Sequence, residues 1–229
     1  MSWVFDNLGL IGELTLVHAR QSVIALVIGF VLSVPLGWVA WRYKIVRSGI
    51  ITITGLLYTI PSIALLLLLP PVLGYPILSE ANLIVALTIY ALAILVRAVA
   101  DGLDSVDPAV RQAAIAVGFG PFRRFWAIEF PLAGPVILAG LRVTAASTVS
   151  LTTVGILVGI INLGYLFTNG LQRRIVPEVL TGVVVVMVLA LVIDAILVIL
   201  GRVLMPWVRA HRTRSRSGSV RTAVAEKAA

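Results

Sequence analysis

The sequence is a series of long apolar segments separated by short charged ones. The apolar segments cover Ser22–Ala40, Ile50–Leu69, Ala81–Val96, Leu132–Leu157 and Val179–Leu200. A helix of about 20 apolar residues crosses the ~30 Å hydrocarbon layer of a membrane. A chain with 60% hydrophobic and only 12% charged residues does not fit a soluble globular fold. The sequence therefore predicts an all-α, polytopic bundle of about five transmembrane helices.

The fourth apolar stretch leaves the number of spans open. Residues 132–161 are too many for one untilted helix and too few for two full spans with a turn. A sixth, partial or re-entrant element is therefore an alternative to five simple spans.

The basic residues predict how the chain is oriented. Most of the 18 Lys and Arg residues lie after the first, third and fifth spans, at positions 41–49, 97–131 and beyond 200. Because cytoplasmic loops near a membrane are enriched in Lys and Arg, we expect these segments inside and the N-terminus outside. The expected divisions are an external segment over 1–21, a transmembrane domain over 22–206 and a basic, disordered cytoplasmic tail over 207–229. The start of the chain also lacks the pattern of a cleavable signal peptide, so the first span is expected to direct insertion.

Several classes of function are excluded by the residues that the chain lacks. It has no cysteine, its two histidines lie near opposite ends, and it has no phosphate-binding loop of the Gly-x-x-x-x-Gly-Lys type. We therefore expect no catalytic residue, no metal site and no cofactor. The net charge of +8 follows from the orientation signal and does not indicate a nucleic-acid partner.

Two features of the spans concern helix packing. Ala25, Gly29, Ser33 and Gly37 form a row of small residues on one helix face, which predicts close contact with another helix. Arg142 and Asp194 are charges inside apolar stretches, so each should face a partner or a wet cavity. We expect Arg142 to snorkel or to lie against the cytoplasmic loops. For Asp194 structural pairing is favoured, and the alternative is an ion-coupled secondary transporter, although no ladder of acidic residues accompanies it.

The hydrophilic segment 97–131 predicts two short helices. Asp107 followed by Pro108 is typical of a helix N-terminus, and an Ala-rich helix is expected over Ala109–Val117. Gly118 and the Gly120-Pro121 pair end it, and a basic, aromatic segment follows over 122–128. Small side chains and three arginines in such an element favour the docking of another protein.

This segment resembles a motif of the ABC importer permeases. In that family Glu-Ala-Ala is followed by three residues, a glycine, nine residues and Ile-x-Leu-Pro. Here Gln112-Ala113-Ala114, Gly118 and Ile128-Glu129-Phe130-Pro131 keep every spacing, with Gln112 and Phe130 as the departures. The resemblance implies a type I importer permease, without enzymatic activity, in a prokaryotic inner or plasma membrane. It implies that the loop seats a coupling helix on an ATP-binding subunit through Arg111, Gln112, Ala113, Ala114, Gly118, Phe119, Gly120 and Pro131.

The same resemblance implies the remaining partners. They are a second permease subunit, identical or homologous, and an extracytoplasmic solute-binding protein. The segment from Tyr58 to Gly74 is similar to one in the osmoprotectant permeases for glycine betaine, carnitine, choline and proline, and the segment 159–164 is similar to their Gly-rich stretch. Polar groups in or beside apolar spans are the candidates for the translocation path, namely Tyr58, Thr59, Ser62 and Thr144. The open alternative is a permease for methionine or another amino acid.

Overall fold

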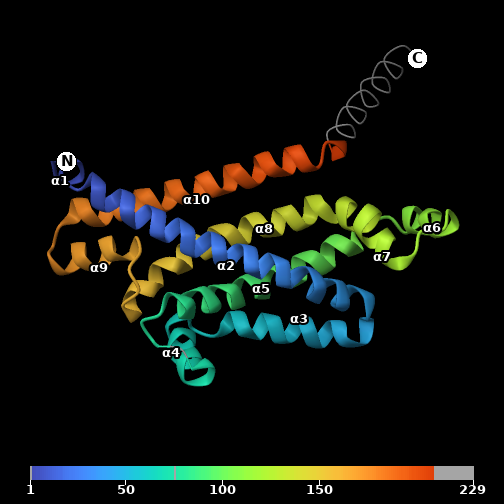
Figure 1. Cartoon of the computed structure of the whole chain (residues 1–229), viewed down its shortest axis with the longest axis horizontal. Helices are drawn as coiled ribbons and strands as arrows, with labels where there is room; N and C mark the ends of the chain where they lie inside the picture. The colour runs from blue at the N-terminus through green and yellow to red at the C-terminus, as the bar shows by residue number, and fades with distance from the viewer. Residues whose placement is uncertain (1, 75, 209–229) are drawn as a thin grey trace, which may run out of the picture.

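The computed structural model describes residues 2–74 and 76–208, and that part of the chain folds into helices without a strand. Its long helices run roughly side by side along one axis (Figure 1). The helices are α1 (Ser2–Asp6), α2 (Leu8–Arg42), α3 (Lys44–Thr59), α4 (Ser62–Leu73), α5 (Glu80–Asp104), α6 (Pro108–Ala116), α7 (Pro121–Arg124), a π-helical turn (Phe125–Glu129), α8 (Phe130–Thr152), a 3-10 segment (Thr153–Val158), α9 (Gly164–Gln172) and α10 (Val176–Leu204). Residues 209–229 of the predicted tail lie outside the described residues.

The predicted all-α transmembrane bundle is confirmed. Four segments are long and apolar enough to cross a membrane: α2, α5, the stretch from α7 through the 3-10 segment, and α10. A fifth span results if the bent pair α3 and α4 is counted as one. The sequence placed one span over Ile50–Leu69, and the structure forms it from two helices that meet at an angle of 107°.

The break between α3 and α4 follows from Pro61. Proline lacks an N–H and disfavours a helical conformation in the residue before it. Ile60 accordingly has φ −66° and ψ 126°, an extended conformation. Its carbonyl oxygen accepts a hydrogen bond of 2.6 Å from the hydroxyl of Tyr90 on α5. A carbonyl released by a helix break within a membrane needs such a partner, so Tyr90 stabilises the bend.

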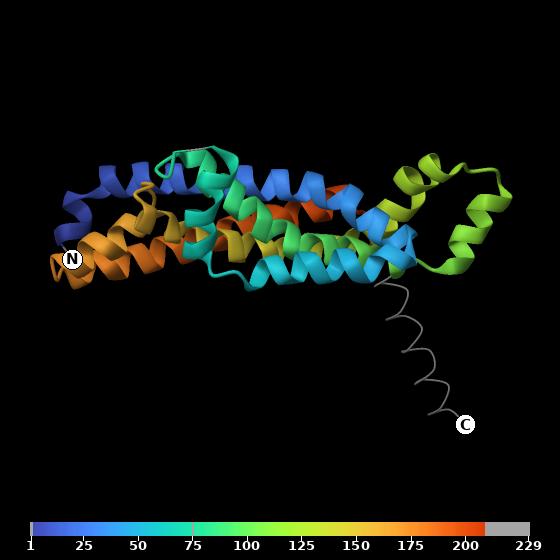
Figure 2. The same cartoon turned by 90° about the horizontal axis from the view of Figure 1, so that it is seen from below.

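Helix α5 is the centre of the bundle, with α2, α3 and α8 packed around it (Figures 1 and 2). The small-residue row of α2 faces α5, as predicted. A Cβ added to Gly29 would lie 2.6 Å from the Cβ of Ala91, and one added to Gly37 would lie 2.6 Å from the Cβ of Val99. The backbones of the two helices therefore approach too closely for larger side chains at these glycines.

Two helices extend further than the sequence predicted. Helix α2 begins at Leu8, so much of the segment 1–21 belongs to the first long helix. His18 within this extension is fully buried and its Nε2 lies 2.9 Å from the carbonyl oxygen of Val149 on α8. Helix α5 continues to Asp104 because residues such as Val99 and Leu103 are buried in the core.

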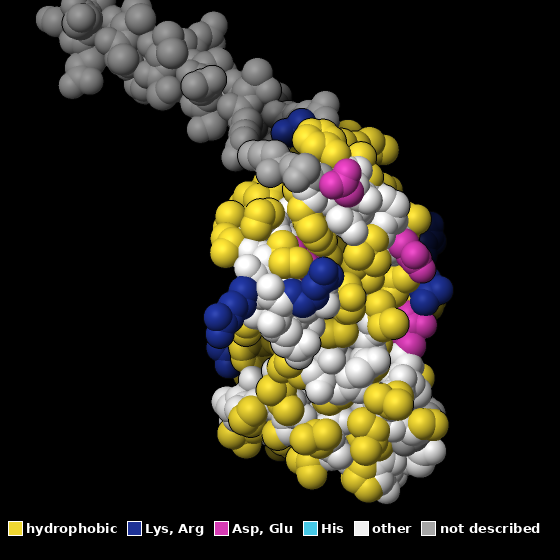
Figure 3. All heavy atoms as spheres, turned by 90° about the vertical axis from the view of Figure 1, so that its left-hand side faces the viewer, with side chains coloured by type: hydrophobic (Ala, Val, Ile, Leu, Met, Phe, Trp, Pro, Cys, Tyr) yellow, Lys and Arg dark blue, Asp and Glu magenta, His cyan; other side chains and the backbone are white. Residues whose placement is uncertain are grey.

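The two ends of the bundle differ. The α2–α3 junction, α6, α7 and the C-terminal end of α10 lie at one end, and the N-terminus and α9 lie at the other (Figure 1). The described parts of the three basic segments thus share one end. Seen from the opposite end, apolar side chains cover much of the surface and charged side chains form a few separate groups (Figure 3). Many large apolar side chains along α2 and α10 are also exposed, which fits a hydrocarbon environment around the long helices.

Candidate coupling site and translocation path

Helix α6 is capped at both ends as its sequence predicts. Asp107 Oδ1 accepts a hydrogen bond of 2.8 Å from the backbone N–H of Ala109. At the other end the N–H of Gly118 donates to the carbonyl of Ile115, and that of Phe119 donates to the carbonyl of Ala114. This pair of bonds requires a left-handed residue after the helix, and Gly118 supplies it with φ +90°. The glycine therefore fixes where α6 stops.

The second half of the loop joins the membrane domain directly. After Gly120 the chain forms α7 and the π-helical turn, which continue into α8. Both α6 and α7 extend beyond the bundle (Figure 2). Phe125 is buried in the π-helical turn, and its ring centroid lies 4.9 Å from Trp126 and 5.6 Å from Phe130. Aromatic packing thus fixes the end of the loop that leads into α8, whereas α6 and the turn after it protrude from the bundle (Figure 2).

Glu129 is the central polar residue of the loop. Its side chain is 1% exposed, and Oε1 accepts hydrogen bonds from Arg111 Nε at 3.1 Å and from Arg124 Nε at 2.8 Å. The carboxylate therefore holds the two halves of the loop together. Sequence reasoning assigned no role to Glu129. The available signal was that it is the single acidic residue of segment 108–131, among three arginines.

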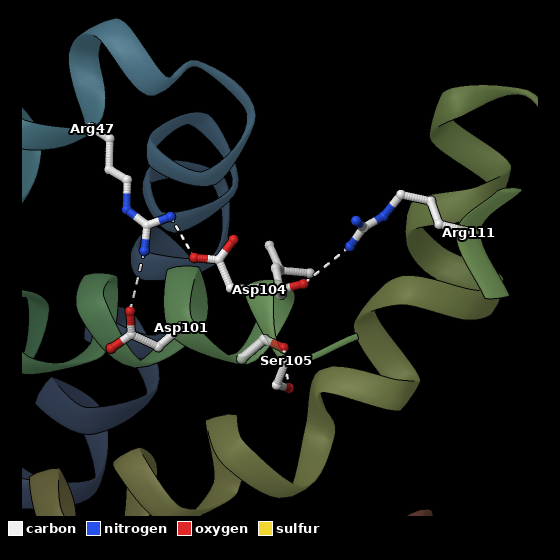
Figure 4. Close-up of polar contacts among 7 residues, drawn as sticks. Arg47, Asp101, Asp104, Ser105 and Arg111 are labelled. Carbon is white, nitrogen blue, oxygen red and sulfur yellow. Dashed lines mark hydrogen bonds and ion pairs between the residues drawn. The ribbon is translucent and has the colours of Figure 1, made fainter. Parts of the chain in front are cut away.

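Arg111 faces inward, in contrast to the prediction that it contacts a partner protein. Besides Glu129 it donates from Nη2 to the carbonyl of Leu103 at 3.1 Å (Figure 4). Its guanidinium also lies 4.7 Å from the ring centroid of Trp41 at the end of α2. One side chain on α6 therefore contacts the ends of α2 and α5 and the turn that leads into α8.

A second polar contact fixes α3 to the base of the loop. Arg47 near the start of α3 donates to Asp101 at 3.3 Å and also to Asp104, both on the last turns of α5 (Figure 4). Carboxylates near the C-terminus of a helix are unfavourable because the helix dipole is negative there. Arg47 offsets this charge. The helix end from which α6 departs is consequently held from two sides, by Arg47 and by Arg111.

The other predicted docking residues divide into exposed and covered ones. Gln112, Ala113, Gly118 and Gly120 are exposed, whereas Ala114 is buried, Phe119 is half-buried beneath Arg123, and Pro131 lies in the first turn of α8. Three large apolar side chains that the sequence reasoning did not assign are also exposed there: Ile115, Val117 and Phe122. We call the four exposed predicted residues and these three apolar residues the docking surface. A surface that is both apolar and protruding is typical of a protein-binding element.

Three of the four predicted path residues lie together at the α3–α4 break. Tyr58 stacks edge-on against Tyr90 with the ring centroids 5.8 Å apart, and Thr59 donates to the carbonyl of Leu56. Ser62 begins α4 directly after the bend. Thr144 is a correction: its side chain is fully buried and donates to the carbonyl of Gly140 in its own helix. It therefore cannot line a path in this structure.

The two charges within the spans pair with each other. Arg142 on α8 donates from Nε to Asp194 Oδ1 at 2.6 Å and from Nη2 to Oδ2 at 2.8 Å. This confirms the pairing expected for Asp194. Arg142, which we expected to snorkel or to lie against the cytoplasmic loops, instead reaches across to α10. Among the described residues no group of three or more His, Cys, Asp or Glu side chains is placed to hold a metal ion.

The sequence matches a known family over almost all of the membrane domain. The family described as "Binding-protein-dependent transport system inner membrane component" matches residues 22–210. The chain belongs to this family. It is thus a multi-pass inner-membrane permease component, as the loop motif implied.

Similar proteins support the same assignment. The osmoprotectant import permease protein OsmW of Salmonella typhimurium is 30% identical over 89% of this chain and 96% of its own length. The choline transport system permease protein OpuBB of Bacillus subtilis is 33% identical over 85% of this chain and 90% of its own. Among solved structures, an inward-facing MetNI methionine ABC transporter superposes with a TM-score of 0.79 at 20% identity, covering 87% of this chain and 98% of that one. At this identity the likeness shows a shared fold.

Proposed function

We propose that this permease couples to separate ATP-hydrolysing subunits through the docking surface on α6 and α7. The observation that carries the proposal is the combination of an exposed tip and a fixed base. Arg111 and Glu129 tie the loop to α2, α5 and α8, so a displacement of the tip would move the long helices. The residues proposed to contact the ATPase are accordingly Gln112, Ala113, Gly118 and Gly120 with their apolar neighbours, while Arg111, Ala114, Phe119 and Pro131 support them.

The proposed orientation places the docking surface in the cytoplasm and the N-terminus outside. The shared position of the basic segments at one end of the bundle supports it. Because the chain has no cysteine, single cysteines at Val117 and at Leu171 in α9 provide a direct test. In intact cells a membrane-impermeant maleimide should label Leu171→Cys and leave Val117→Cys unlabelled until the membrane is opened. The reverse pattern would contradict the orientation.

The proposed assembly contains two permease subunits, two ATPases and an external solute-binding protein. The family description names dependence on a binding protein, and the long α10 exposes a large apolar surface that lipid or a second permease can cover. Within this chain, the membrane domain over 22–206 would form half of the translocation path. The bend occupied by Tyr58, Thr59 and Ser62 is proposed to line part of it, since it brings three polar side chains together next to α4, whose other residues are all apolar.

We propose a small compatible solute as substrate, of the class that includes glycine betaine, choline, carnitine and proline. The names of the two similar permeases, for an osmoprotectant and for choline, support this class, as does the segment from Tyr58 to Gly74. The methionine alternative has only a likeness of fold in its favour.

The test is uptake by proteoliposomes that contain the permease, its ATPase and its binding protein. Labelled glycine betaine, choline, carnitine, proline and methionine should be compared with and without internal ATP. We expect ATP-dependent uptake of at least one compatible solute, unchanged when proton and sodium gradients are collapsed. Gradient-dependent uptake without ATP would contradict the importer, and uptake of methionine alone would contradict the substrate class.

A further inference from the structure

The pair between Arg142 and Asp194 lies deep along its two helices. Asp194 is ten residues before the end of α10 and Arg142 is ten before the end of α8, or about 15 Å of helix in each case. Yet the two side chains remain 44% and 32% exposed. A charge at such depth is costly when it faces lipid. The exposed side of this pair therefore requires a polar or water-filled surrounding.

The surface on either side of the pair is hollowed. A hollow of about 370 Å³ extends from Arg142 toward the end that carries the coupling loop, lined by Pro135, Gly201 and Arg202 among others. A second hollow of about 300 Å³ begins at Ala146 and extends the opposite way, past Ser150 and Thr153. The pair thus lies between two hollows that follow the same α8–α10 groove.

Next to Arg142, the α8 wall of the second hollow includes small and hydroxyl side chains. Ala146 and Ser150 line this hollow and are exposed on the same side of α8 as Arg142. Small side chains leave space beside the guanidinium and the carboxylate, and hydroxyl groups can bind water or solute. The exposed face of α10, in contrast, carries large aliphatic side chains such as Leu191 and Val192.

We propose that Arg142 and Asp194 form a binding site for a zwitterionic solute, with its carboxylate on Arg142 and its cationic group on Asp194. This rests on the proposed function as an importer of small compatible solutes. The Nε and Nη2 atoms of Arg142 now donate to the two carboxylate oxygens of Asp194. A solute carboxylate can replace that of Asp194 in the same bidentate geometry. Asp194, once released, is then neutralised by the ammonium group of the same molecule.

The charges of the pair set the selectivity of such a site. A simple anion can bind Arg142 but leaves Asp194 without a counter-charge. A simple cation can bind Asp194 but competes with Arg142 for it. A zwitterion satisfies both groups at once and leaves neither charge unpaired at this depth along the helices. We therefore expect the binding of glycine betaine to depend on both residues. Choline lacks a carboxylate, so we expect its binding to depend on Asp194 alone.

The other ion pairs between helices differ in position. Arg20 pairs with Glu80 at the first residue of α5, and Arg47 pairs with Asp101 and Asp104 at its last turns. Each of these pairs lies at an end of α5. Arg20 is therefore a matched control, since its removal also breaks an exposed pair between two long helices but leaves the α8–α10 groove intact.

The first experiment measures access to the groove without relying on transport. Single cysteines at Ala146 and Ser150, in the full complex in proteoliposomes, are treated with a water-soluble methanethiosulfonate reagent. We expect both to react, and 10 mM glycine betaine to slow the reaction at least threefold, whereas Leu171→Cys should react with no protection and buried Ala145→Cys should not react. Unreactive cysteines at 146 and 150 would show that lipid or a second copy seals the groove, and reaction without protection would show that no solute binds; either overturns the proposal.

The second experiment separates binding from a structural role. Arg142→Lys keeps the charge but loses the planar fork, and we expect the KM for glycine betaine to rise at least fivefold while that for choline changes less than twofold. Asp194→Asn should raise the KM for both solutes, and Arg20→Gln should change neither KM. Equal effects of Arg142→Lys on the two solutes would identify the pair as a structural contact and overturn the proposal. If the wild-type complex transports neither solute, the proposed function fails, and protection of the cysteines by glycine betaine still decides the site.

Discussion

Arg111 Nε lies 3.1 Å from Oε1 of Glu129, and this contact joins α6 to the π-helical turn that leads into α8. Glu129 also binds Arg124 and is almost fully buried. Both halves of the loop therefore depend on one carboxylate, and motion of α6 relative to α8 requires that this contact change.

Replacing Glu129 by Gln should uncouple the loop from the membrane domain. Glutamine keeps the shape but lacks the negative charge, so the hydrogen bonds to the two arginines lose about 1.5–3 kcal/mol in total. We expect ATP hydrolysis in the assembled complex to become less dependent on solute, with transport reduced several-fold. Parallel assays of ATPase rate and uptake check this, and an unchanged ratio of solute transported to ATP hydrolysed would contradict it.

Gly118 should be sensitive to side-chain size because of both conformation and exposure. Its φ of +90° makes any L-residue with a Cβ strained by about 1–2 kcal/mol, yet an added Cβ meets no atom within 4 Å. Gly118→Ala therefore reports the strain alone. Gly118→Arg adds bulk on the docking surface and should abolish transport and ATPase binding while membrane insertion is retained. Co-purification of the ATPase measures the difference; if the Arg variant retains the ATPase as well as the Ala variant, the docking role is refuted.

Asp107 should stabilise α6 through its cap. Asp107→Ala removes the acceptor for the N–H of Ala109, which costs about 1 kcal/mol of helix stability. Hydrogen exchange of the amides over 109–117 should become about fivefold faster in the isolated permease. Asp107→Ser retains an acceptor and serves as the control, so equal exchange in the Ala and Ser variants would argue against the cap.

Tyr90 should stabilise the bend between α3 and α4. Tyr90→Phe leaves the ring packed against Tyr58 but removes the hydroxyl that binds the carbonyl of Ile60. A buried carbonyl without its partner costs about 1–3 kcal/mol. Unfolding in mixed detergent micelles should show a loss of this size. A variant as stable as the wild type would indicate that water takes the place of the hydroxyl.

Much of the loop over 97–131 was predictable because its signals are local. Asp107 and Pro108 mark the start of α6 and Gly118 marks its end, since capping and left-handed conformations depend on neighbouring residues. The direction of Arg111 was not predictable in this way. Its partners Trp41, Leu103 and Glu129 come from different helices, and only their packing makes an inward position more favourable than an exposed one.

The residues predicted to line the translocation path show the same limit of prediction from sequence. A polar residue in an apolar span can face water, bond to its own helix or join a partner, and the sequence does not distinguish these. Thr144 bonds to Gly140 within α8 and is buried, whereas Arg142, two residues earlier, is exposed and pairs with Asp194. A helix turns by about 100° per residue, so neighbours along the chain face different surroundings.

The sequence alone determined that the chain is a bundle of membrane-spanning helices with a hydrophilic loop of two short helices, because span length, apolar composition and capping residues act over short stretches of chain. The tertiary structure decided that Tyr90 stabilises the bend at Pro61, that Glu129 joins the halves of the loop, and that Arg142 meets Asp194 beside a groove. These features depend on contacts between residues that lie 18 to 52 positions apart in the sequence. Such contacts form only once the helices pack.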